Sequence, residues 1–168
     1  MRALIVLAAF LFSISPRSGR AVSYDTLALG RVDSFNLAVE AIDANSRTCG
    51  IQKSTIFNAI EYPLVGTGLR VVPTGDIILD VAIASIIIHT RTCVTTYNLN
   101  ITAYLPVLFG GKSSLEGVLF WSSTGVISSD LSNHASHFDE ALRQEARDLV
   151  VSWNGAQHGC TSFDRNRR

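Results

Sequence analysis

The chain has 168 residues, of which 47% are hydrophobic and 17% are charged. This length is typical of one domain, and this composition excludes an intrinsically disordered chain. The 14 basic and 14 acidic residues balance, and the only lysines are Lys53 and Lys112. The basic surface expected of a nucleic-acid-binding protein is therefore missing, and we predict no nucleic-acid partner.

The first 21 residues have the pattern of a cleavable export signal. Arg2 provides the positive start, residues 4–14 form an apolar run, and Gly19 and Ala21 place small residues where a signal peptidase cleaves. A run of this length is too short to span a bilayer, which takes about 20 residues. The alternative is a buried N-terminal helix or a membrane anchor.

We therefore predict a signal peptide over residues 1–21, a single domain over residues 22–157 and a flexible polar tail over residues 158–168. After cleavage the protein is expected to be periplasmic or secreted, and not an integral membrane protein.

The first half of this domain contains three predicted elements. Residues 35–41 alternate between apolar and other side chains, which predicts a half-buried strand, and the polar residues 43–48 stop it. Residues 56–64 show helical spacing, with Pro63 ending the helix. Residues 69–72 predict a short strand.

The second half begins with two long strands, residues 76–90 and 93–105. A turn at residues 110–112 leads into a strand over 115–123, which a serine-rich turn follows. The last helix carries an apolar stripe and is closed by Gly155. The stripe contains Phe138, Leu142, Leu149, Val150 and Trp153, opposite Glu140, Arg143, Glu145 and Arg147.

The expected order of elements is β-α-β-β-β-β-α. It predicts an α+β fold with a mostly antiparallel sheet of four or five strands and two helices packed on one sheet face. In residues 93–105 the odd-numbered side chains form one face, and the even-numbered ones between 96 and 102 are polar. The second sheet face is therefore expected to be solvated or to meet a polar partner.

This topology brings several side chains to one edge of the sheet. Cys49 and Cys93 become neighbours there, so a disulfide between them is predicted, whereas Cys160 lies in the tail. The alternative is three unpaired thiols.

The same edge collects cationic and imidazole side chains near the N-termini of both helices. They form a candidate rim for an anion or a partner, because free N–H groups and positive charge coincide there. The alternative is a set of solvated loop ends. The rim residues are Arg47, His89, Arg91, His134 and His137.

Catalytic and metal motifs are scarce. His134 and His137 have an H-x-x-H spacing that suits two metal ligands on one side of a helix, although exposed or capping histidines are the alternative. No G-x-S-x-G motif or phosphate loop occurs, and no cofactor is predicted.

The leading hypothesis is an exported, non-catalytic binding or accessory protein of the cell envelope or extracellular space, whose partner is a protein or an envelope component. The alternative is a small exported enzyme or metal-binding protein that uses His89, His134 or His137. A third hypothesis is a homodimer joined at an edge strand through Tyr97, Tyr104 and Trp121.

Overall fold

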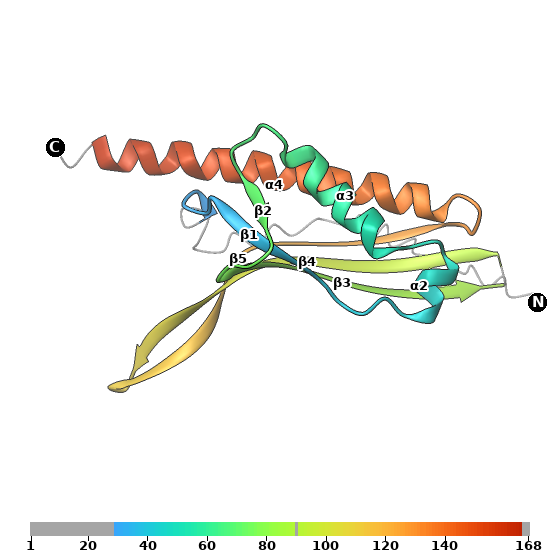
Figure 1. The fold of residues 1–168 in the computed structure, drawn as a ribbon, viewed down its shortest axis with the longest axis horizontal. Coiled ribbons are helices and arrows are strands. Elements are labelled where there is room, and N and C mark those ends of the chain that lie inside the picture. Colours follow the sequence, from blue (N-terminus) through green and yellow to red (C-terminus); the bar gives the residue numbers. More distant parts are fainter. Residues whose placement is uncertain (1–28, 90, 166–168) are drawn as a thin grey trace, which may run out of the picture.

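The computed structural model describes residues 29–89 and 91–165 (Figure 1). The predicted export signal lies outside the described residues. The fold is α+β, as predicted. Its elements are β1 (Ser34–Val39), α2 (Ala44–Thr48), α3 (Lys53–Leu64), β2 (Arg70–Val72), β3 (Ile77–Ile88), β4 (Thr92–Phe109), β5 (Lys112–Asp130) and α4 (His134–Arg165).

The five strands form a mixed sheet in the order β2-β1-β3-β4-β5. β3, β4 and β5 are antiparallel, but β1 runs parallel to both β2 and β3, which departs from the mostly antiparallel sheet we expected. The physical reason is that α2 and α3 connect β1 to β2 as a crossover, and such a connection returns the chain in the same direction.

The chain then changes from one side of β1 to the other. β2 ends with Val72 opposite Asn36, and Ile78 of β3 pairs with the same Asn36 on the other side. The four residues between these strands cross β1 at that point, where a Cβ atom on Gly75 would lie 4.0 Å from the backbone nitrogen of Asn36.

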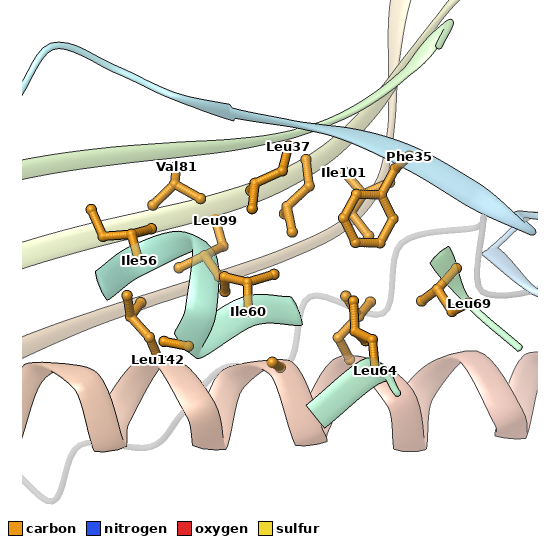
Figure 2. Close-up of a cluster of buried hydrophobic side chains, with 14 of the residues drawn as sticks. Phe35, Leu37, Ile56, Ile60, Leu64, Leu69, Val81, Leu99, Ile101 and Leu142 are labelled. Atoms are coloured by element: carbon orange, nitrogen blue, oxygen red, sulfur yellow. The ribbon is translucent and has the colours of Figure 1, made fainter. Parts of the chain in front are cut away.

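Helices α3 and α4 cover one face of the sheet (Figure 1). Figure 2 shows the core between the sheet and these helices, in which Leu99 of β4 points toward Ile60 of α3, and Phe35 of β1 points toward Leu64 of α3. These residues are at most 4% exposed. The predicted alternation of β4 is confirmed, since its odd-numbered residues from 93 to 103 are buried.

Strands β4 and β5 form a long hairpin that turns at Gly110 and Gly111, both with positive φ. β3 begins at Ile77, opposite Ala103, so the hairpin beyond this pair has two strands, which project from the body (Figure 1). We call residues 104–119 the arm; its last two residues, Val118 and Leu119, lie opposite Ala103 and Thr102 at its base. The strand predicted over 115–123 is longer than expected, because the serine-rich segment 122–125 continues it instead of turning.

Helix α4 continues through Gly155 to Arg165, so the prediction that Gly155 ends it is wrong. A glycine ends a helix when it adopts a left-handed conformation, and Gly155 is not among the glycines with positive φ. The indole of Trp153 donates a hydrogen bond to the carbonyl of Val32 at 2.7 Å, which fixes this part of α4 to the segment before β1.

Candidate functional site

The predicted disulfide between Cys49 and Cys93 is present, with Cα atoms 6.0 Å apart. Cys49 follows the last residue of α2 and Cys93 is the second residue of β4. Both are fully buried. The bond confirms that the segment before α3 and the start of β4 meet at one end of the sheet.

The predicted rim residues surround this end of the sheet. His89 lies in the turn from β3 to β4 with φ 50°, and the carbonyl of Arg91 accepts a hydrogen bond from the backbone of Leu131 at 2.7 Å. This bond joins the β3–β4 turn to the β5–α4 turn. His137 is exposed in the first turn of α4.

Arg47 lies beside a hollow of about 470 Å³ near the N-terminus of α3. Lys53, the first residue of α3, lines the same hollow. Both cations already donate to backbone carbonyls, Arg47 to Ile42 and Lys53 to Val39, each at 2.9 Å. Both positive groups therefore already stabilise the loop between β1 and α2 through these hydrogen bonds.

His134 differs from the exposed or capping histidine considered above, because it is fully buried. Its Nε2 atom lies 2.7 Å from the hydroxyl of Thr95, and its Nδ1 atom lies 2.8 Å from the hydroxyl of Ser129. Burial lowers the pKa of His134, and the nearby His137 lowers it further. With both nitrogens bonded to hydroxyls, neither is free to hold a metal ion. In the described residues no three His, Cys, Asp or Glu side chains gather as a metal site.

The bond from His134 to Thr95 continues through further side chains, which we call the hydroxyl chain. Thr95 contacts Ser85 at 2.7 Å, Ser85 contacts Ser46 at 2.8 Å, and Ser46 reaches the carboxylate of Asp43 at 2.8 Å. The chain therefore runs from Asp43, before α2, across β3 and β4 to α4. All members between Asp43 and His134 are buried.

The carboxylate of Asp43 fixes the direction of the first bond in the hydroxyl chain. Partial burial opposes its ionisation, but hydrogen bonds from Ser46 and Ser85 lower the pKa of Asp43 overall. An ionised carboxylate only accepts hydrogen bonds, so Ser46 must donate its single hydroxyl hydrogen to it. Ser46 also lies in donor geometry toward Ser85, and the contact between Ser85 and Thr95 suits either hydroxyl as the donor.

A neutral imidazole donates from one ring nitrogen and accepts at the other, so one of Thr95 and Ser129 accepts a hydrogen bond from His134 and the other donates one. A hydroxyl beside an imidazole resembles a nucleophile beside a general base, but His134 is fully buried, so a leaving group cannot reach it. These hydrogen bonds connect α2, β3, β4, β5 and α4 beneath the rim.

The sequence interpretation missed the hydroxyl chain, although one signal for it was present. Ser85 and Thr95 are polar residues at positions where the strand alternation points to the core. Buried hydroxyls require hydrogen-bond partners, so two of them opposite each other on neighbouring strands indicate a polar network.

A second polar cluster lies under α4. The hydroxyl of Tyr97 donates to Glu145 at 2.9 Å, and Ser123 donates to the other oxygen of the same carboxylate at 2.5 Å. Burial raises the pKa of Tyr97, and Glu145 raises it further. Glu145, expected on the solvent side of α4, therefore faces β4 and β5. Tyr97 is only 7% exposed, so it is not available for the edge contact considered above.

The sheet face opposite the helices is uncovered by any described element (Figure 1), and we call it the open face. β4 has no charged residue along its whole length. A shallow hollow of about 530 Å³ lies at its middle, where the Oδ1 atom of Asn98 is buried without a hydrogen-bond partner in the described part of the chain. The hollow is lined by Glu40, Ala82, Ile83, Ala84, Thr96, Tyr97, Asn98, Thr124, Gly125 and Val126.

The arm extends the open face with apolar side chains. In antiparallel pairs, directly opposed residues share a face, so Tyr104, which is opposite Gly117, lies on the same side as Leu108, Leu115 and Leu119. Their exposed fractions are 52%, 79%, 68% and 42%, respectively. Contiguous exposed apolar side chains of this kind mark interaction surfaces.

In a comparison with known proteins, the sequence matches no family model and no curated protein. Within the described residues, none of the helices is both long enough and apolar enough to cross a bilayer.

Proposed function

We propose that the protein is an exported, non-catalytic binding protein of the cell envelope or extracellular space, and that the open face with its arm binds the partner. The observation that carries this proposal is the row of four apolar arm residues, exposed by 42–79% on one face. The unpaired acceptor of Asn98 adds a polar group that a donor from the partner would satisfy.

The chemistry of the arm favours a protein as the partner. Beyond Ala103 the arm is two-stranded, so within the described residues the backbone on both outer edges has no neighbouring strand. Inside a bilayer these backbone groups would have no hydrogen-bond partners, which is why isolated ribbons do not enter the hydrocarbon. Lys112 and Glu116 near the tip add charge to the second strand. A protein surface accommodates both features.

Export is supported by the sequence of residues 1–21 and by the disulfide, since disulfides persist in oxidising compartments. Mass spectrometry of the protein isolated from its own cells tests this part. We expect the mature chain to begin at Val22. A chain that retains Met1 would contradict export by a cleaved signal.

Site-specific crosslinking tests the binding surface. A photo-activated side chain in place of Leu115 is expected to give a discrete adduct in the native cells. The matched control is Val151, which is 70% exposed on α4 compared with 68% for Leu115. Equal adducts at both positions, or none at Leu115, would contradict the assignment of the arm.

The alternative hypothesis of an enzyme or metal-binding protein gains no support from the geometry around His134. That residue is buried and bonded at both ring nitrogens.

A further inference from the structure

The two edges of the sheet are protected to very different extents. β2, at one edge, is three residues long, carries the exposed Arg70 and is followed by Pro73. Short length, charge and proline are the usual devices that stop an edge strand from pairing with another chain. This edge is therefore closed to strand addition.

β5, at the other edge, has 19 residues and pairs only with β4 in the described part of the chain. Between Gly117 and Ser129 it contains no charged residue and no proline. The one irregularity is a bulge opposite Ile101 and Thr102. A long, uncharged edge of this kind presents a row of backbone donors and acceptors that favours pairing with another strand.

We infer that β5 pairs with β5 of a second copy, in antiparallel orientation about a two-fold axis. A strand that meets its own copy in this way matches it in length, and the uncharged stretch brings no like charges together. The helices of both copies then lie on the same side of one ten-stranded sheet.

Side chains along β5 suit this pairing. With Thr124 at the axis, Trp121 lies opposite Ile127 of the second copy, because both are three residues from the axis. Both side chains are half-buried in one copy, so their remaining exposed surface would be covered. Pairs of an aromatic and a β-branched residue are favourable across antiparallel strands.

This dimer goes beyond the proposed function and leaves the arm available. Because the two β5 strands run in opposite directions, the two arms point away from each other at opposite ends of the joined sheet. Each arm keeps its apolar face, so the dimer offers two partner-binding surfaces.

A charge-swap experiment on the mature protein tests the inference. Thr124 is exposed and lies near the proposed axis, so Thr124→Lys or Thr124→Glu places two like charges close together. Sedimentation over a dilution series should show a wild-type dimer. Each variant alone should raise the dimer dissociation constant at least about tenfold. The mixture of the two variants should bring the constant back toward the wild-type value. Val151→Lys, at a comparably exposed position on α4, should leave it unchanged.

Three results would overturn the inference. The first is a monomeric wild type, which includes a monomer whose own residues 22–28 cover the edge of β5. The second is a dimer that the Thr124 variants do not weaken. The third is a mixture of the two variants that fails to recover the dimer. Circular dichroism of the variants checks that they fold. Because Thr124 lines the hollow of the open face, crosslinking at Leu115 is measured in the chain with native Thr124. A Leu115 adduct from a monomeric protein would overturn the dimer and leave the proposed partner binding standing, so the two failures are distinguishable.

Discussion

Breaking the disulfide between Cys49 and Cys93 is expected to lower the free energy of unfolding by roughly 4 kcal/mol. The two cysteines are 44 residues apart in sequence. In the loop-entropy model, a closed loop of this length lowers the entropy of the unfolded chain by about 13 cal/mol/K. Multiplied by a temperature of about 298 K, this entropy gives the predicted loss.

Urea unfolding of the protein with and without a reductant measures this loss. Reduction leaves both sulfur atoms in place, so it separates the effect of the crosslink from the effect of packing. With a urea dependence of about 2 kcal/mol per molar, the midpoint should fall by about 2 M. A Cys160→Ala background excludes exchange with the third cysteine. An unchanged midpoint would refute the loop-entropy reasoning, because it would mean that the crosslink does not restrict the unfolded chain.

Two further predictions concern buried contacts. In the folded protein burial lowers the pKa of His134 from 6.5. The contribution of His134 to stability is therefore constant above this pH and falls as the pH is lowered through it, because the unfolded chain binds the proton more readily. Urea midpoints between about pH 7.5 and 5.5 should show this fall in the wild type and a smaller one in His134→Gln; equal slopes would argue against it. Gly125→Ala should lower the free energy of unfolding by about 1–3 kcal/mol, because the new Cβ atom would collide with the ring of Tyr97, whose Cε1 would lie 2.7 Å away. Gly155→Ala, with open space around it inside α4, should instead raise the free energy of unfolding by about 0.5–1 kcal/mol, and thermal unfolding of both variants measures the two changes.

Local patterns in the sequence were sufficient to predict most elements and the disulfide. The alternation along residues 93–105 identified the buried face of β4, and the position of each cysteine at an element end led to the pairing of Cys49 with Cys93. These inferences depend on periodicity and chain order, which are visible in one sequence.

Features that depend on distant contacts were not predicted. The crossing near Gly75 places β1 between two strands that run parallel to it, and the sequence shows only a turn there. The serine-rich segment 122–125 has the composition of a turn, but pairing with β4 holds it as strand, and Tyr97 occupies the space that a side chain at Gly125 would need. Likewise, the charge on Glu145 indicated solvent, whereas its partners lie on two strands.

The place of β1 in the sheet has a consequence for the order of folding. β3, β4 and β5 are joined by tight turns, so they can pair as soon as they are made, from contacts close in sequence. β1 lies between β2 and β3, both of which follow it in the chain. In a chain made from its N-terminus, the fully buried Phe35 therefore lacks its strand partner until Val71 has been made, and Leu37 lacks its partner in β3 until Leu79 has been made.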